Sequence, residues 1–229
     1  MECRIFVREK GGKRMKIKWL GHASFLITSD KGVKIITDPY QAGGPIQYGE
    51  IKGPADVVTV SHEHSDHNHV TPVEGNPQII RDPKPAEIKG IKVKGVATFH
   101  DQNKGKDRGN NTVFCFEVDN IRICHLGDLG HMLSDQEVAQ IGRVDILLTP
   151  MAGLYTINAE VATAVSNQLK PKVIIPMHYK NERCNIPVST VDDFLKGKKN
   201  VTRMDSSEIE FKAGKLPTET KIIVLKPAL

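Results

Sequence analysis

The 229-residue sequence has few cysteines and no long apolar run, and these two absences exclude several classes of protein. Its four cysteines are scattered and form no C-x-x-C pair, which excludes a disulfide scaffold and a thiolate metal clip and suits a reducing compartment. The first residues, MECRIFVREK, carry charges where a signal peptide needs an apolar stretch. No window reaches the roughly 20 apolar residues of a membrane span. We therefore expect a cytoplasmic protein with no membrane span.

A strong excess of charge of one sign is also lacking. The chain has 32 Lys and Arg against 27 Asp and Glu, a formal charge of +5 that favours anionic partners only weakly. Phe, Trp and Tyr make up 5% of the residues, whereas single-stranded nucleic acid is bound largely by aromatic stacking. The scarcity of aromatic residues argues against a nucleic-acid partner, whereas the positive charge favours one only weakly. The composition leaves the oligomeric state open.

No linker rich in Pro, Gly or Ser divides the chain, and no internal repeat is present. Residues 15–229 are therefore expected to form a single domain, in which a chain of this length can bury a sizeable core. Residues 1–14 hold five basic and two acidic residues and are expected to be an N-terminal extension or an edge strand. We expect them to be dispensable, so a chain starting at Met15 should keep its melting temperature.

Short apolar runs bounded by turn residues predict a series of strands, and two capping signals predict helices. Ser134 and Glu137 form a capping box, and Asn158 is expected to cap a helix that runs to about Leu169. Its inner face is predicted to carry Val161, Ala164, Val165 and Leu169. A third helix is expected near 189–196. The predicted strands are 16–20, 23–28, 33–37, 57–60, 91–99, 112–118, 121–126, 145–149, 173–176, 208–211 and 221–225. One α/β domain with two sheets and outer helices accommodates this order.

The segment from His62 to His67, HEHSDH, carries the strongest chemical signal in the chain. It places three imidazoles and two carboxylates in six residues directly after a buried strand, and such groups need partners once they are desolvated. On a tight turn at a strand end these side chains can converge, and His and Asp supply the ligand atoms that zinc and similar metals accept. The alternative is a solvated histidine-rich loop.

Three further polar residues follow apolar strands at equivalent positions. His100 follows VKGVATF, Asp128 follows IRICHLG, and His178 follows VIIPM. Each by itself is more often a core or loop residue, but together with the His62–His67 segment the three form a set that favours a metal site.

With these residues in order, the chain resembles the metallo-β-lactamase superfamily, whose H-x-H-x-D-H motif matches His62, His64, Asp66 and His67. The resemblance implies a four-layer αβ/βα sandwich, the metallo-β-lactamase fold, with two mixed β-sheets flanked by helices. Asp38 resembles the acidic residue that braces the motif loop in that family. GHASF at 21–25, Asp38-Pro39 and GDLGH at 127–131 are similar to the branch of ascorbate-6-phosphate lactonase-like and N-acyl phosphatidylethanolamine phospholipase D-like proteins.

The resemblance implies two divalent metal ions, with zinc favoured and manganese or iron as alternatives. One ion would be held by His62, His64 and His100. The second would be held by Asp66, His67 and His178, with Asp128 bridging the two. Such a pair supplies a hydroxide nucleophile near neutral pH, which Asp66 could orient, and polarises the substrate oxygen.

Two histidines and two basic segments are expected near these ligands. His22 and His131 are placed close to the metals without being ligands, and His131 could donate a proton to a leaving group. Hydrogen bonding of His131 to a loop carbonyl is the alternative. The basic residues after His100 and His178 could bind a phosphate or carboxylate, or could simply form a solvated surface; they are Lys104, Lys106, Arg108, Lys180 and Arg183.

The sequence thus predicts a dinuclear metal-dependent hydrolase that attacks an ester, lactone or phosphodiester of a small anionic substrate. Two alternatives remain open: a metal-dependent nuclease, and a non-catalytic metal-binding domain. The third motif position is His64 rather than the Glu of the di-iron redox members, and Asp128 stands where the true β-lactamases have Cys. These departures favour a hydrolytic site and disfavour antibiotic hydrolysis.

Overall fold

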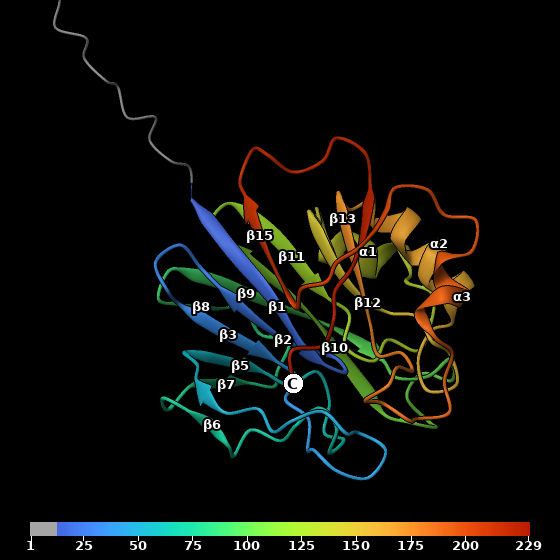
Figure 1. Cartoon of the computed structure of the whole chain (residues 1–229), viewed down its shortest axis with the longest axis horizontal. Coiled ribbons are helices and arrows are strands. Elements are labelled where there is room, and N and C mark those ends of the chain that lie inside the picture. Colours follow the sequence, from blue (N-terminus) through green and yellow to red (C-terminus); the bar gives the residue numbers. More distant parts are fainter. Residues whose placement is uncertain (1–12) are drawn as a thin grey trace, which may run out of the picture.

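The computed structural model describes residues 13–229, which form two mixed β-sheets and three helices (Figure 1). Most of the predicted 1–14 segment therefore lies outside the described residues, and the first strand begins at Arg14. The six-stranded sheet has the order β15 (Glu208–Lys212), β1 (Arg14–Gly21), β2 (Ser24–Thr28), β3 (Lys34–Thr37), β5 (Val57–Thr59) and β7 (Gln78–Ile80).

The eight-stranded sheet contains most of the second half of the chain, and its central strands run parallel. Its order is β14 (Val201–Arg203), β16 (Lys221–Val224), β13 (Val173–Met177), β12 (Ile146–Pro150), β11 (Ile121–His125), β10 (Asn110–Val118), β9 (Ile91–Phe99) and β8 (Ala86–Ile88). A small third pair joins β4 (Gly53–Pro54) to β6 (Val73–Glu74). The two mixed sheets expected from the sequence are confirmed.

The three helices are α1 (Asp135–Ile141), α2 (Ala159–Leu169) and α3 (Val191–Leu195) (Figure 1). α2 packs against α3 and β12, whereas α1 lies apart from them, against β9. Both predicted caps are present, because Ser134 and Glu137 satisfy each other's main chain and Asn158 accepts from the Val161 amide. Among the described residues, no helix is long and apolar enough to cross a membrane.

The buried face of α2 differs from the predicted one by about one position. Ala162 and Ser166 are buried in place of Val161 and Ala164, which are only half-buried. The Ser166 hydroxyl donates to the carbonyl of Ala162 at 2.7 Å, so a serine can be buried there without leaving its polar group unpaired.

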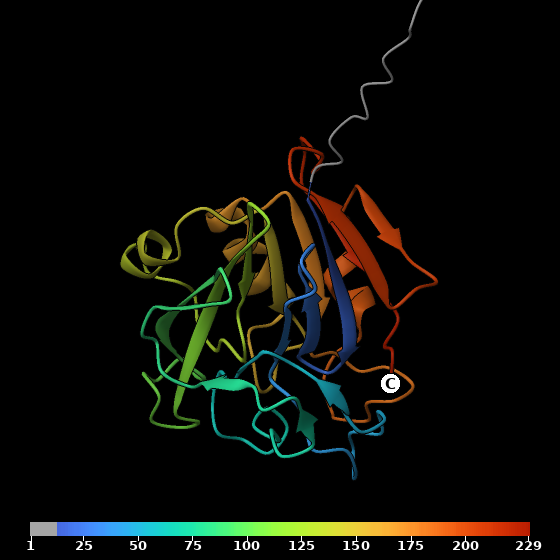
Figure 2. The ribbon, with the colours of Figure 1, turned by 90° about the vertical axis from the view of Figure 1, so that its left-hand side faces the viewer.

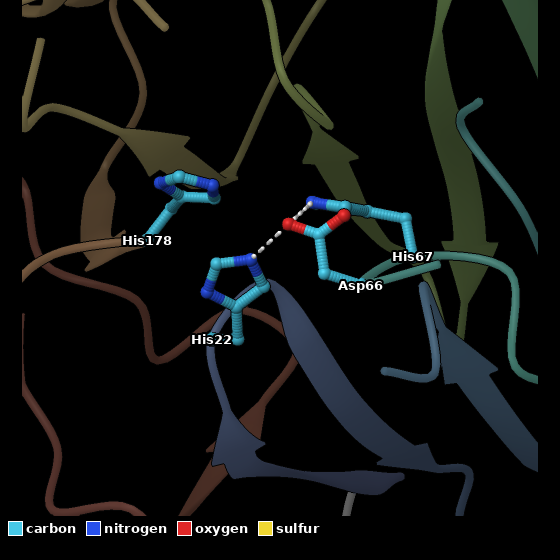
Figure 3. Close-up of side chains that lie close together, drawn as sticks. All are labelled: His22, Asp66, His67 and His178. Carbon is cyan, nitrogen blue, oxygen red and sulfur yellow. Dashed lines mark hydrogen bonds and ion pairs between the residues drawn. The ribbon is translucent and has the colours of Figure 1, made fainter. Parts of the chain in front are cut away.

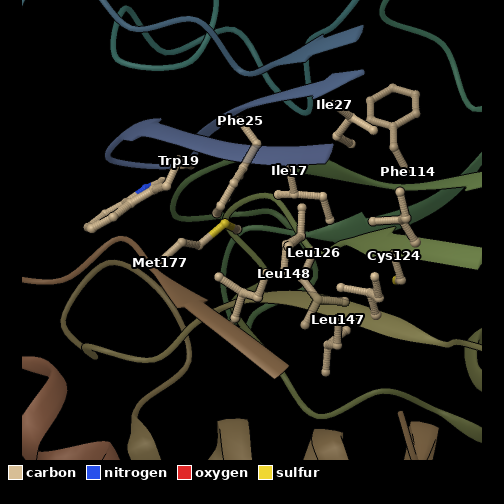
Figure 4. Packing of buried hydrophobic residues seen from close by; sticks show 14 of the residues in the cluster. Ile17, Trp19, Phe25, Ile27, Phe114, Cys124, Leu126, Leu147, Leu148 and Met177 are labelled. Carbon is tan, nitrogen blue, oxygen red and sulfur yellow. The ribbon is translucent and has the colours of Figure 1, made fainter. Parts of the chain in front are cut away.

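The core between the sheets is formed by apolar side chains that alternate along the facing strands. Figure 4 shows Ile17, Phe25 and Ile27 of β1 and β2 opposite Leu148 and Met177 of the eight-stranded sheet. All five are fully buried, and each buried side chain of this size contributes about 1.5–3 kcal/mol to folding. This core fixes the position of one sheet against the other.

The strand ends that carry the predicted ligands meet at one end of this sandwich. β9, β11 and β13 run in the same direction, so their carboxyl ends lie at the same edge of the sheet. Figure 2 shows the loops that follow β3 and β13 gathered at the lower end of the molecule in that view. Polar residues that follow these strands are therefore brought together.

Candidate metal centre

Asp128, in the loop after β11, lies at the centre of a histidine cluster. Its Oδ2 atom is 3.3 Å from the Nε2 atoms of both His67 and His178, 3.4 Å from that of His100, and 4.0 Å from that of His62. The carboxylate therefore faces four imidazoles from three different segments of the chain. All of these side chains are buried.

One group of potential ligands consists of His62, His64 and His100, whose ligand atoms all lie within 4.8 Å of one another. The turn after β5 is closed by the His67 amide donating to the His64 carbonyl, which turns the first two imidazoles toward each other. His62 Nε2 and His64 Nδ1 are only 3.0 Å apart. His64 is the exposed member of the group.

The second group consists of His22, Asp66, His67 and His178 (Figure 3), again with ligand atoms within 4.8 Å of one another. Asp66 Oδ2 is 3.2 Å from His22 Nε2 and 3.7 Å from His67 Nε2. The Asp66 side chain keeps 36% of its surface exposed, so its second oxygen is accessible from the cavity.

His22 reaches this group from the turn between β1 and β2. Gly21 has φ +133°, and an added Cβ there would lie 2.6 Å from the Tyr48 ring, so only glycine fits. His22 itself has φ +50°, and its carbonyl accepts hydrogen bonds from the Trp19 indole and the His178 amide. The turn thus fixes the ring of His22 against that of His178, 4.1 Å away between centroids.

Asp38, directly after β3, holds the loop that contains the His62–His67 segment in place. Its carboxylate accepts from the Ser61 amide at 2.8 Å, from the Ser61 hydroxyl at 2.5 Å, and from Nδ1 of His67 at 2.9 Å. Because an ionised carboxylate can only accept, His67 donates from Nδ1 to Asp38 and directs its Nε2 toward the cluster. The sequence predicted the brace but gave no indication of Ser61.

Asp128 is held in place by Gly127 and Asn111. Gly127 has φ +55°, and an added Cβ would lie 2.4 Å from Asn111 Oδ1. That same oxygen accepts the Asp128 amide at 2.9 Å, while Asn111 Nδ2 donates to Thr98 and Leu126. Sequence reasoning missed Asn111, whose signal is only a polar residue inside an apolar strand.

The electrostatics of the cluster favour neutral imidazoles at His22, His62 and His100, whose pKa values are lowered chiefly by burial. Burial lowers the pKa of His62 to about 3 and that of His22 to about 4, so both are neutral at pH 7 and able to bind a metal. Burial alone would raise the pKa of Asp128, but the imidazoles of His178 and His67 hold it well below its usual value. Burial lowers the pKa of His67, but Asp128 and Asp38 outweigh it and raise that pKa well above its usual value. Asp128 is thus held ionised, and its negative charge favours a positive charge beside it and His67.

Unpaired polar atoms are concentrated in the residues of this cluster. Within residues 13–229, seven buried side-chain nitrogen or oxygen atoms have no hydrogen-bond partner, and five belong to this cluster. They are His22 Nδ1, His67 Nε2, His100 Nδ1, Asp128 Oδ1 and His178 Nδ1. Buried polar groups without partners are rare unless a ligand or ion satisfies them. The residues present therefore fit a divalent metal chemically, with nitrogen and carboxylate donors of the kind that zinc accepts.

The structure brings all seven predicted ligands together, and it adds His22 to them. It does not bring His131 into the cluster. His131 Nδ1 donates to the Met132 carbonyl at 2.8 Å, and Nε2 accepts from the Phe99 amide at 3.1 Å. Both ring nitrogens are thus used by the main chain, so the geometry favours the loop-bonding alternative over a proton donor.

A cavity of about 250 Å³ opens onto the cluster. Besides His64, Asp66, His100, Asp128 and His178, its walls consist of Arg108, Tyr155 and Ile186. Of the five basic residues singled out in the sequence, only Arg108 lines this cavity.

Comparison with known proteins gives a consistent result. The family model described as "Beta-lactamase superfamily domain" matches residues 16–178. A metal-dependent hydrolase from Pelotomaculum thermopropionicum is 31% identical over 197 residues, which cover 72% of this chain and 84% of that protein.

Two solved structures extend the comparison to the fold. A candidate zinc-dependent hydrolase of the metallo-β-lactamase superfamily from Thermotoga maritima is 41% identical, with a TM-score of 0.77 over 92% of this chain and 98% of that chain. A candidate metal-dependent hydrolase from Parabacteroides distasonis is 19% identical, with a TM-score of 0.63 over 93% of this chain and 94% of that chain, and supports the fold alone.

Proposed function

Because this chain belongs to the metallo-β-lactamase superfamily and is one of its metal-dependent hydrolases, we propose that it uses two divalent metal ions to hydrolyse an ester, lactone or phosphodiester bond in a small anionic substrate. The observation that carries the proposal is the position of Asp128 Oδ2, which lies within 3.3–4.0 Å of four histidine nitrogens. Two dications that lie close together repel each other unless an anion separates them, and Asp128 is the carboxylate available for this.

His62, His64 and His100 would hold one ion, and Asp66, His67 and His178 the other. His22 is a further candidate ligand of the second ion, because one of its ring nitrogens lies within 4.8 Å of the ligand atoms of Asp66, His67 and His178. When bound, such ions lower the pKa of water and polarise the oxygen of a substrate. Zinc is favoured by these ligand types and by the relative at 41% identity, which is described as zinc-dependent; manganese and iron are the alternatives.

The protein's own groups would orient water and exclude solvent. His22 holds one oxygen of Asp66 by a hydrogen bond, which leaves the other oxygen free to accept a hydrogen bond from the attacking water. The Asp66 pKa is lowered: burial alone would raise it, but the bond from His22 and the charge of His67 outweigh burial, so the carboxylate is ionised. The cavity of about 250 Å³ at the cluster suits a small substrate, and a groove of about 570 Å³ lined by His62, His64 and Arg108 adjoins it.

Elemental analysis of the purified chain by plasma mass spectrometry tests the proposal. About two metal ions per chain are expected in the wild type and fewer in Asp128→Ala, because that substitution removes the shared anion. Asp56→Asn is the matched control, since Asp56 bonds Lys34 and Lys89 away from the cluster.

The metal-loaded protein would then be tested on 4-nitrophenyl acetate, a sugar lactone and bis(4-nitrophenyl) phosphate. Hydrolysis of at least one class is expected in the wild type and is expected to be lost with the metal. Absence of metal after reconstitution with zinc, manganese and iron would refute the proposal. Full loading without turnover on any class would instead favour a non-catalytic metal-binding domain.

A further inference from the structure

Arg108 is the cationic side chain among the residues that line the cavity at the candidate metal centre. Its guanidinium carbon lies 4.7 Å from the centroid of the Tyr155 ring, so the planar group rests on an aromatic face. Within residues 13–229, no carboxylate forms an ion pair with this guanidinium. By contrast, Arg81, in an adjoining groove that Arg108 also lines, donates from Nη1 to both oxygens of Glu63, at 2.7 and 2.8 Å.

The main chain that carries Arg108 is held by one buried carboxylate. Asp101 Oδ1 accepts from the amides of Asn103 and Gly105, and Oδ2 accepts from those of Asp107 and Arg108, at 2.7–3.0 Å. Four charge-assisted hydrogen bonds to one side chain fix the loop after His100. The position of Arg108 beside the cluster is thus built into the fold.

From these contacts we infer that Arg108 and Tyr155 form an anion-binding subsite, which takes a carboxylate or phosphate group of the substrate while the bond to be cleaved lies at the metal centre. This inference rests on the proposed hydrolase function for its substrate, but not for the binding itself. A guanidinium offers a flat fork of donors that matches two oxygens of a carboxylate or phosphate, and the Tyr155 face leaves that fork free.

Of the five basic residues that the sequence suggested for anion binding, only Arg108 belongs to the subsite. Lys104 and Lys106 belong to the same loop but are exposed, and neither lines the cavity. Lys180 and Arg183 follow His178 and are likewise outside its walls. We therefore expect anion binding to depend on the charge of Arg108 and not on the charges of Lys104 and Lys106.

Calorimetric binding to the zinc-loaded full-length protein tests the subsite without requiring turnover. Acetate can occupy only one anion position, whereas succinate and phosphonoacetate can reach a second one, so the ratio of the acetate Kd to the Kd of each larger anion reports the subsite. In the wild type at least one of the two is expected to bind more tightly than acetate. Arg108→Gln is expected to reduce that ratio about 10- to 100-fold, the range for charge-assisted hydrogen bonds.

Three variants separate a binding role from a structural one. Lys106→Gln removes a charge from the same loop and is expected to leave the ratio at its wild-type value. Arg108→Lys keeps the charge but loses the fork, and an intermediate ratio is expected. Tyr155→Leu removes the aromatic ring under the guanidinium and is expected to reduce the ratio. Tyr155→Phe keeps the ring and should keep the ratio at its wild-type value.

A second measurement uses hydrolysis of 4-nitrophenyl acetate and of the mono-4-nitrophenyl ester of succinic acid. Arg108→Gln is expected to reduce the preference for the anionic ester, measured as a ratio of kcat/KM values and carried mainly by KM. If neither ester is cleaved but succinate binding still depends on Arg108, the subsite stands and the proposed hydrolysis of such esters fails. Equal binding of succinate by wild type and Arg108→Gln, or equal losses on both esters, would overturn the subsite.

Discussion

Replacing Asp38 by Asn should weaken metal binding although Asn has almost the same shape. In the wild type, the carboxylate accepts from the Ser61 amide, from the Ser61 hydroxyl and from His67 Nδ1. An Asn side chain can still accept from the amide with its oxygen. Its NH₂ group then faces the ring of His67, which must become an acceptor at Nδ1 and carry its proton on Nε2. That proton occupies the lone pair that faces Asp128 and the proposed metal.

The expected magnitude follows from the bonds that change. The hydrogen bonds from the Ser61 hydroxyl and from His67 lose their charged acceptor in a fully buried site, which costs about 1.5–3 kcal/mol of folding stability. For a chain of this length this corresponds to about 3–12 °C in melting temperature. Loss of a residue that orients a metal-binding histidine lowers metal affinity about 10- to 100-fold.

Zinc affinity would be measured by competition with a fluorescent chelator, and the tautomer of His67 by nitrogen NMR of histidine-labelled protein. Asp145→Asn is the matched control. Asp145 is also a buried carboxylate, it accepts hydrogen bonds from the Arg122 amide and the Arg143 guanidinium, and it is distant in sequence from the His62–His67 segment. The control should lose stability but keep its zinc affinity. Wild-type zinc affinity in Asp38→Asn, or an equal loss in both variants, would refute the tautomer argument.

Three further outcomes are expected. Removing the metal with a chelator should lower the melting temperature, by an amount equivalent to about 2.7 kcal/mol when free zinc had been 100-fold above its Kd. Gly130→Ala should reduce both the zinc content, measured by elemental analysis, and the melting temperature, because an added Cβ would lie 2.3 Å from the His100 main chain. Gly49→Ala is the control: its added Cβ would have no contact closer than 3.5 Å, so neither value should change. Asp101→Asn should raise the Kd for succinate more than that for acetate in calorimetry, since the two amides that donate to the replaced oxygen lose their acceptor and Arg108 is no longer fixed.

Much of the candidate centre could be predicted because its members follow strands. The HEHSDH segment is local in sequence, and parallel strand ends meet at one edge, so His100, Asp128 and His178 could be grouped without knowing the strand order. What could not be predicted depends on contacts between distant loops. Arg108 and Lys104 look equivalent in sequence, and only the hydrogen bonds to Asp101 decide which one faces the cavity.

The strands that were missed share a physical feature. β4, β6, β7, β8 and β14 have only two or three residues each, too few for an alternating pattern to stand out. β8 also follows two prolines, Pro83 and Pro85, which are typical of loops and of sheet edges, and it lies at the edge of its sheet. Pairing with a neighbouring strand, rather than local propensity, makes these segments strands.

The two sheets each supply part of the candidate centre, which links metal binding to the folding of the whole domain. The turn between β1 and β2 carries His22, and the loop after β5 carries the HEHSDH segment, both from the six-stranded sheet. His100, Asp128 and His178 come from the other sheet. Since the ligand atoms converge only when the sheets pack together, an ion bound there would stabilise the packed state over the separated one. Metal affinity and domain stability should therefore change together in variants of the interface between the sheets.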